Sequence, residues 1–258
     1  MTAQQRHAGK VVLVTGAGSG IGAAISLQYA LEGAILALVD VQEDSLQRQA
    51  KELQAVGAKV AIAVADVSDY QACEQAHRKL VDELAQPVDI LINNAGISPK
   101  VNGKPSNFWE MDPSEWLRVV GVNLNGAFNW SRLVSPSMVE RRSGRIVNMS
   151  SVAGKFFVAF TAAHYGTTKA ALIGFTRDLA GELGPYGITV NALAPGRINT
   201  PLMKTASQAT NDAVIQETAL RRLGEPSEVA QMCCFLTSPE SSFITGQVVD
   251  VAGGWLMT

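Results

Sequence analysis

Cysteine is scarce in this chain and is not arranged for disulfides or for metal. The 258 residues include three cysteines, Cys73 and the adjacent pair Cys233 and Cys234. An odd number without a Cys-x-x-Cys spacing argues against a disulfide framework. The three histidines also lack the spacing of zinc ligands. We therefore expect reduced, buried thiols and no metal site.

Long runs of one charge and long apolar runs are absent as well. Lys and Arg number 21 against 23 for Asp and Glu, a net charge of -2 with no basic tract. Nucleic acid and anionic membranes are therefore poor candidates as partners. Thr15 and Gly16 interrupt the apolar segment near the N-terminus, which excludes a signal peptide or membrane span there. We expect a cytoplasmic protein with a large core, since 47% of its residues are hydrophobic.

A short strand, a glycine-rich turn and a helix are predicted near the start of the chain. Residues 10–14 are apolar and β-branched, residues 15–22 read Thr-Gly-Ala-Gly-Ser-Gly-Ile-Gly, and a helical pattern then stops at Gly33. Such glycines let backbone N–H groups approach a pyrophosphate at the positive end of a helix. The register is ambiguous, and a turn that binds nothing is the alternative. The predicted dinucleotide contacts are Gly16, Ser19, Gly20, Ile21 and Gly22.

The second predicted strand, residues 34–39, is followed by an acidic residue. Asp40 lies about 20 residues beyond the glycines, where a carboxylate can bind the adenosine ribose hydroxyls. The same carboxylate would repel a 2′-phosphate, and neither Ser19 nor a neighbour of Asp40 supplies positive charge. We predict NAD(H) as the cofactor in preference to NADP(H). A strand-end cap is the simpler alternative for Asp40.

Strands alternate with helices along the rest of the chain. Further strands are predicted at residues 59–65, 88–92, 145–149, 188–193 and 248–251. This order predicts an α/β fold: a Rossmann-type doubly wound parallel sheet of about seven strands with helices on both faces. No linker, repeat or low-complexity tract divides it, so we expect one domain over residues 1–258. Four polar residues are expected together at the carboxyl edge of this sheet: Asp40, Asp66, Asn93 and Ser151.

Tyr165 and Lys169 are four residues apart, which places both on one face of a predicted helix. A phenol has a pKa of about 10, and a nearby ammonium lowers it. The pair therefore makes sense as a tuned proton donor and acceptor. A lone Tyr-x-x-x-Lys is more often a surface tyrosine beside a solvated lysine, so the prediction depends on the other motifs.

Taken together, these motifs resemble the short-chain dehydrogenase/reductase family in its small single-domain branch. The motifs appear in the family's order and span most of the chain: Thr15-Gly-x-x-x-Gly-x-Gly22, Asp66, Asn93-Asn-Ala-Gly96, Asn123, Ser151, Tyr165-x-x-x-Lys169 and Pro195-Gly196. The resemblance implies four catalytic residues, Asn123, Ser151, Tyr165 and Lys169. It also implies cofactor contacts at Asp66, Val67, Asn93, Ala95, Gly96, Tyr165, Lys169, Pro195, Gly196, Ile198 and Thr200. Members are commonly tetramers, which implies a homotetramer here.

The implied reaction interconverts a secondary alcohol and a ketone by hydride transfer to or from NAD, with Tyr165 moving the proton. A sugar, polyol, hydroxy acid or steroid is the expected kind of substrate. A 3-oxoacyl-(acyl-carrier-protein) reductase is the alternative enzyme, although such reductases usually prefer NADPH. A non-catalytic dinucleotide-binding regulator is the alternative outside enzymes, and the four catalytic-type residues argue against it. A nucleotide-sugar epimerase fits neither the glycine spacing nor the chain length.

Three variable segments are expected to determine substrate choice. The connection over residues 97–109 is long and contains Lys100 and Lys104, which could receive an acidic substrate or simply be solvated. Residues 156–160 contain three phenylalanines that could form an apolar wall over the substrate or pack elsewhere. Residues 202–220 mix polar and apolar side chains in a way suited to a lid.

Overall fold

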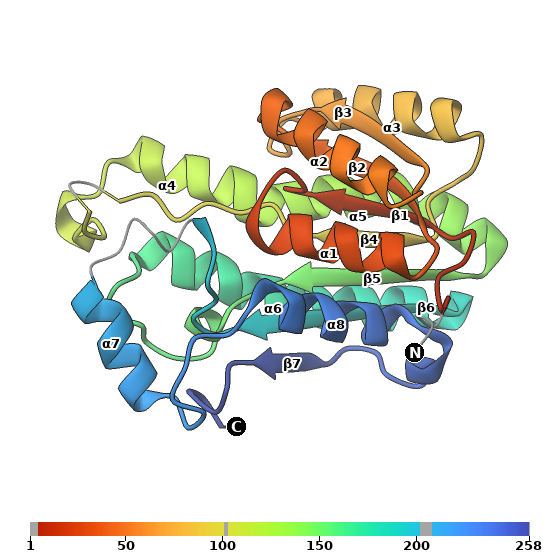
Figure 1. Ribbon diagram of the computed structural model, residues 1–258. Helices are drawn as coiled ribbons and strands as arrows, with labels where there is room; N and C mark the ends of the chain where they lie inside the picture. Colours follow the sequence, from red (N-terminus) through yellow and green to blue (C-terminus); the bar gives the residue numbers. More distant parts are fainter. Residues whose placement is uncertain (1–4, 101–102, 202–207, 258) are drawn as a thin grey trace.

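The computed structural model describes residues 5–100, 103–201 and 208–257. Its centre is a parallel sheet in the order β3-β2-β1-β4-β5-β6-β7 (Figure 1). The strands are β1 (Val11–Thr15), β2 (Ile35–Asp40), β3 (Val60–Val64), β4 (Ile90–Asn93), β5 (Gly144–Met149), β6 (Ile188–Pro195) and β7 (Val248–Val251). The order reverses at β1, from which the chain first builds outward to β3 and then crosses to β4. This confirms the predicted doubly wound fold, and each predicted strand lies within two residues of the observed one.

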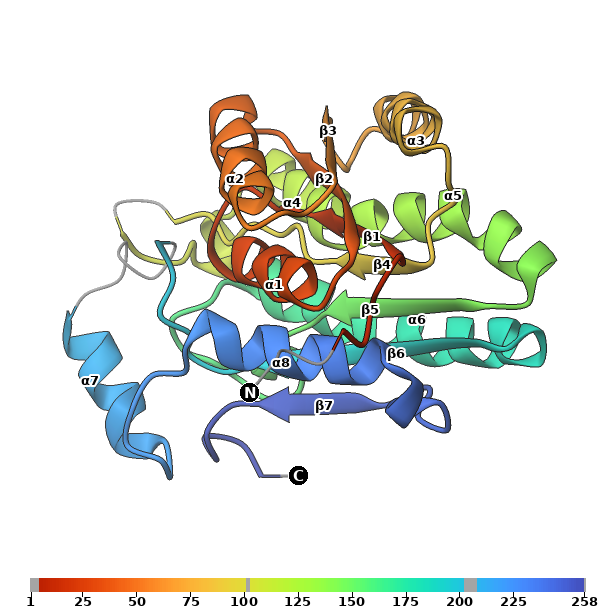
Figure 2. The ribbon, with the colours of Figure 1, turned by 45° about the vertical axis from the view of Figure 1, so that its right-hand side comes forward.

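Helices cover both faces of the sheet, as the alternation of strands and helices predicts. One face carries α1 (Gly20–Leu31), α2 (Glu43–Ala55) and α8 (Pro226–Thr237), which lie together in Figure 2. The other face carries α3 (Tyr70–Leu84), α5 (Gly126–Arg141) and α6 (Ala163–Leu183). In the described ranges, no helix combines the length and apolarity needed to cross a bilayer.

The alternation of side chains along β1 divides the core in two. Val11 and Leu13 pack with α3, α5 and α6, whereas Val12 and Val14 pack with α1, α2 and α8. All four side chains are fully buried. Burial on both faces is why the strands read as continuous apolar runs and not as alternating ones.

The segment around Asn123 consists of three successive elements. α4 (Pro113–Val120) runs into a π-helical turn, η2 (Gly121–Asn125), before α5 begins. The Asp112 side chain accepts a hydrogen bond from Ser114 N (2.7 Å) and so caps the start of α4. A π turn places one extra residue in the helix and so changes the direction of the side chains beyond it. The π turn directs the side chain of Asn123 into the interior of the molecule.

The chain returns to the carboxyl edge of the sheet after β6. Part of the segment expected to be a lid, residues 202–207, lies outside the described residues. Its remainder contains α7 (Gln208–Glu217), which stands beyond the strand arrowheads at the left of Figure 1. A bridge between Ile198 and Gly224 ties the segment after β6 to the start of α8.

Candidate active site

A cleft of about 720 Å³ opens at the carboxyl edge of the sheet, where the loops after β1 to β6 meet. Parallel sheets bind ligands at this edge, where the strand order reverses. Most of the residues predicted from the sequence lie along it: Gly16, Ser19, Gly20, Ile21, Asp40, Asp66, Val67, Ala95, Gly96, Ser151, Tyr165, Lys169, Pro195, Gly196, Ile198 and Thr200. Gly22, Asn93 and Asn123 do not line it.

The glycine loop is shaped by close backbone contacts. Gly16 and Gly20 have φ of 64° and 57°, a region that favours glycine. A Cβ on Gly22 would lie 2.1 Å from the carbonyl oxygen of Gly16. Gly22 therefore lets α1 pack directly under the loop, which explains why it supports the cleft without lining it.

Asp40, at the end of β2, holds this loop in place. One carboxylate oxygen accepts a hydrogen bond from Gly18 N and the other from Gln42 N, each at 2.9 Å. The carboxylate is therefore fixed at the cleft, with its charge beside the glycine loop. An incoming phosphate at this position would meet that charge directly.

Asp66 and Val67 follow β3 at the same end of the cleft. The Asp66 carboxylate accepts hydrogen bonds from the Ser68 backbone N (2.9 Å) and hydroxyl (2.7 Å), which shape the turn. Val67 is buried, and its carbonyl oxygen accepts a 2.8 Å hydrogen bond from the Asn129 side chain. The turn is thus attached to α5.

The structure places Asn93 away from the cleft. Its amide Nδ2 donates to Asn148 Oδ1 (2.8 Å) and Ser131 Oγ (3.1 Å) in the layer of α5. The next residue, Asn94, faces the cleft, and its Nδ2 donates to the carbonyl oxygens of Thr15 (3.0 Å) and Gly16 (3.1 Å). Asn94, which the sequence analysis did not single out, therefore joins β4 to the glycine loop.

Ser151 and Tyr165 meet where the loop after β5 approaches the start of α6. A hydrogen bond joins the two hydroxyls and lowers the pKa of Tyr165, but burial has the larger effect and raises it above its usual value. The sequence predicts that Lys169 lowers this pKa, whereas the two influences on it here are burial and Ser151. The phenol is therefore protonated at neutral pH in this structure.

Lys169 lies one turn further along α6, with its side chain buried. Its ammonium donates a 2.7 Å hydrogen bond to the carbonyl oxygen of Met149 and lies 5.6 Å from the ring centroid of Tyr165. Burial lowers the pKa of Lys169 to about 8. The predicted helical spacing is confirmed, because both side chains reach the cleft.

Asn123 contacts the cleft indirectly, through the loop after β4. Its Oδ1 accepts from Ile97 N (2.7 Å), and its Nδ2 donates to Ile97 O (3.0 Å) and Thr168 Oγ1 (3.2 Å). The amide therefore ties the loop that contains Gly96 to α6. Both ends of the amide are used in this arrangement.

Aromatic rings line the end of the cleft beyond Tyr165. Phe160 stacks on Trp255 with centroids 5.9 Å apart, and Phe156 meets the same indole edge-on at 5.4 Å. Phe160 and Trp255 face the cleft, whereas Phe157 is 85% exposed and lies outside it. Phe160 and Trp255 thus form an apolar wall of the cleft, and Phe156 packs against the indole. The sequence did not predict the part of Trp255.

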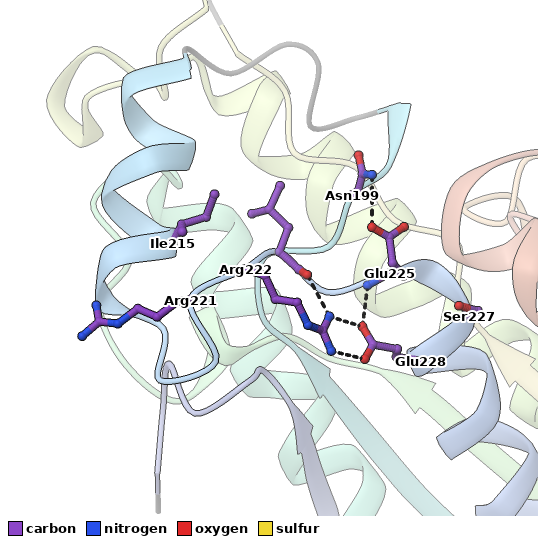
Figure 3. A pocket seen from close by; sticks show the side chains of 8 residues that line it. Asn199, Ile215, Arg221, Arg222, Glu225, Ser227 and Glu228 are labelled. Carbon is purple, nitrogen blue, oxygen red and sulfur yellow. Dashed lines mark hydrogen bonds and ion pairs between the residues drawn. The ribbon is translucent and has the colours of Figure 1, made fainter.

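A second hollow, at the junction of α7 and α8, offers less to a ligand (Figure 3). Arg222 donates two hydrogen bonds to the Glu228 carboxylate, which also accepts from Glu225 N. Arg221 points away from this group (Figure 3). The charges converging here neutralise one another, so we place the chemistry in the cleft.

The cleft fits a nicotinamide dinucleotide. The glycine loop leads into the N-terminus of α1, whose N–H groups and dipole suit a pyrophosphate. A Cβ on Gly20 would be in ordinary van der Waals contact with Thr200, 3.6 Å away, so the glycine loop and the segment after β6 face each other across the cleft. A fixed carboxylate at one end and a buried Tyr–Lys pair at the other suit the ribose groups of such a cofactor.

Comparison with known proteins gives consistent matches along the chain. A family model described as enoyl-(acyl carrier protein) reductase matches residues 16–256. The crystal structure of a 3-oxoacyl-(acyl-carrier protein) reductase with bound NAD from Brucella melitensis is 47% identical, with a TM-score of 0.93, and covers 100% of this chain and 95% of that chain.

Curated relatives match over a similar length. The 3-oxoacyl-(acyl-carrier-protein) reductase of Thermotoga maritima is 39% identical over 249 residues, 96% of this chain and 98% of the relative. The acetoacetyl-CoA reductase of Shinella zoogloeoides is 39% identical over 248 residues, 95% of this chain and 98% of the relative.

Proposed function

The chain belongs to the short-chain dehydrogenase/reductase family and is an oxidoreductase, and from that premise we propose that it interconverts 3-oxoacyl and 3-hydroxyacyl thioesters with NAD(H). The placing of Ser151, Tyr165 and Lys169 in one cleft with the glycine loop carries this proposal. The names of the relatives support a 3-oxoacyl substrate over a sugar, polyol or steroid.

Each polar group in the reacting half of the cleft has a distinct task. The Ser151 hydroxyl orients the substrate oxygen by hydrogen bonding, and the Tyr165 phenol gives that oxygen a proton during reduction. A phenol kept protonated by burial suits this direction. Lys169 supplies positive charge that stabilises the phenolate left after the transfer. A bound nicotinamide dinucleotide would supply the hydride.

We propose NAD(H) because of the fixed carboxylate of Asp40. Its oxygens accept hydrogen bonds from Gly18 and Gln42, and no cation accompanies it in the loop. The adenosine ribose would bind between Asp40 and the turn at Asp66. The 2′-phosphate of NADP(H) would be repelled by the same carboxylate. The Brucella melitensis reductase, with NAD bound, supports the choice.

The remaining cofactor contacts are proposed from their places along the cleft. Val67, Ala95 and Gly96 follow β3 and β4. Pro195 ends β6, and the residues after it, Gly196, Ile198 and Thr200, would hold the nicotinamide end together with it. We also propose that residues 1–258 act as one domain and that the protein assembles as a homotetramer. Multi-angle light scattering gives the mass that tests the assembly.

Two assays test the function. In the first, an acetoacetyl thioester is reduced with NADH and, in parallel, with NADPH. In the second, a panel of sugars, polyols and cyclic alcohols is oxidised with NAD. We expect thioester reduction, which Tyr165→Phe should lower roughly 10²–10⁴-fold because the proton donor is lost. NADH fluorescence titration should show that the variant still binds the cofactor. Full turnover by Tyr165→Phe, or activity confined to the alcohol panel, would overturn the proposal.

A further inference from the structure

Two of the cations that line the cleft are Arg197 and Lys100. Arg197 lies two residues after the end of β6, and Lys100 lies on the loop after β4. Four strand positions separate β6 from β2 in the sheet, so Arg197 is roughly 20 Å from the adenosine end at about 4.8 Å per strand. Arg197 therefore belongs to the half of the cleft that holds Ser151 and Tyr165, and Lys100 lies near enough to interact with it.

Arg197 is held rigidly against the aromatic wall. Its guanidinium carbon lies 4.7 Å from the ring centroid of Phe160, and Nε and Nη2 donate to Asn211 Oδ1 at 3.1 and 2.7 Å. Phe160 and Asn211 are neutral, so neither cancels the charge of Arg197. The ring and the amide together fix the direction in which the remaining N–H groups point.

Lys100 lies close enough to Arg197 for the two positive charges to interact. Partial burial and the neighbouring guanidinium both lower the pKa of Lys100. Among residues 5–100, 103–201 and 208–257, neither cation has an ion pair with a carboxylate. Two like charges brought together without an acid are costly, and a bound anion would remove that cost.

Resting on the function proposed above, we infer that Lys100 and Arg197 form a subsite for a carboxylate carried on the acyl chain of the substrate. The fork of Arg197 can donate to a carboxylate, with Lys100 as a second donor. Phe160 and Trp255 would pack against the methylene groups between that carboxylate and the reacting ketone. The preferred substrate is then a 3-oxoacyl thioester that ends in an acid and not in a methyl group.

The pyrophosphate of the cofactor is the other anion that could bind Lys100 and Arg197, and the strand order argues against this. The glycine loop and the N-terminus of α1, which suit a pyrophosphate, follow β1, three strand positions from β6. A carboxylate therefore fits better than a phosphate chain.

Turnover by the intact chain gives the first test. N-acetylcysteamine thioesters of 3-oxohexanoic acid and 3-oxohexanedioic acid have equal chain length and differ at the terminal carboxylate. We expect the wild type to prefer the acid at least tenfold in kcat/KM. Lys100→Met should lower this preference tenfold, whereas Lys104→Met, an exposed lysine on the same loop outside the cleft, should keep it. Equal or better use of the neutral thioester by the wild type would overturn the inference.

Calorimetric titration with glutarate, and with neutral glutaramide as its match, separates the two proposals. The wild type should bind glutarate at least tenfold more tightly than Lys100→Met does, and Arg197→Met should behave like Lys100→Met if it folds. If neither thioester is reduced, the proposed function is wrong, but the titration still shows whether Lys100 and Arg197 bind a carboxylate. Equal affinity for glutarate and glutaramide, or a Lys100→Met variant that loses NADH affinity but keeps glutarate binding, would show the inference to be wrong.

Discussion

The ammonium of Lys169 donates a 2.7 Å hydrogen bond to the carbonyl oxygen of Met149 while lying 5.6 Å from the ring centroid of Tyr165. The end of β5 thus fixes a buried charge beside the phenol. Burial of that charge lowers the pKa of Lys169 to about 8. The arrangement costs stability at neutral pH and keeps a cation where the proposed chemistry requires one.

This cost should appear as a pH dependence of unfolding. The pKa of Lys169 is about 8 in the folded protein against 10.5 as its ordinary value, so the unfolded chain binds more protons between these pH values. The stability contributed by Lys169 therefore rises as the pH passes through about 8 toward 10.5. Between pH 7 and pH 9 the rise is on the order of 1 kcal/mol. Urea unfolding of wild type and Lys169→Met at both pH values measures it. A constant difference between the two proteins would contradict the prediction.

Replacing Asp40 should change the choice of cofactor. Asp40→Ala removes the carboxylate that would bind the ribose hydroxyls and repel a 2′-phosphate. We expect kcat/KM for NADH to fall about tenfold, a loss of about 1.4 kcal/mol, and that for NADPH to rise. Glu43→Ala, an exposed carboxylate at the start of α2, is the control and should leave both unchanged. A wild type that uses both cofactors equally would remove the basis for the prediction.

The glycine loop should tolerate no methyl group at Gly22. A Cβ there would lie 2.1 Å from the Gly16 carbonyl oxygen, so Gly22→Ala forces α1 away from the loop. We expect a loss of about 2 kcal/mol in the free energy of unfolding, together with weaker NADH binding. The matched control is Gly174→Ala in α6, where a Cβ meets nothing within 4 Å. That variant should gain about 0.5–1 kcal/mol because alanine favours the helix. Equal stability of the two variants would contradict this account.

Asn123 should matter for stability as well as for rate. Asn123→Ala leaves Ile97 N and Ile97 O without their amide partner in a partly buried place. We expect a loss of about 2–3 kcal/mol, since unsatisfied buried groups cost about 1–3 kcal/mol each. Turnover should fall with it, because Ile97 lines the cleft. Asn125→Ala, an exposed amide in the same π turn, should change neither quantity in urea unfolding and kinetic assays.

The strands and the sheet edge could be predicted because short apolar runs end in glycine, aspartate or asparagine. Strand parity also indicates which of the two asparagines at the end of β4 reaches the cleft. Leu91 faces the layer of α5, so Asn93, two residues later in β4, faces it too, and Asn94 is the residue that reaches the cleft. The prediction of Asn93 came from the family motif and not from this alternation.

Other features of the site depend on tertiary contacts that no local pattern encodes. Arg197, Phe160 and Trp255 come from three distant parts of the chain, and only the folded sheet brings them together. The pKa of Tyr165 is a further example, because the lysine spacing predicts a lowering whereas burial, a property of the whole fold, raises it. The π turn at Asn123 likewise has no marker in its sequence, Gly-Val-Asn-Leu-Asn.

The stacking of Trp255 on Phe160 also gives the protein an optical reporter. Indole emission overlaps the absorption of reduced nicotinamide, so a dinucleotide bound in the cleft would quench Trp255 by energy transfer. Trp130, in α5, is fully buried and Trp109 is 80% exposed, whereas Trp116, in α4, is partly buried like Trp255. Comparison of the wild type with Trp255→Phe therefore isolates the signal of the indole in the cleft. Occupancy of the site can therefore be followed by the fluorescence of a native side chain, without a label.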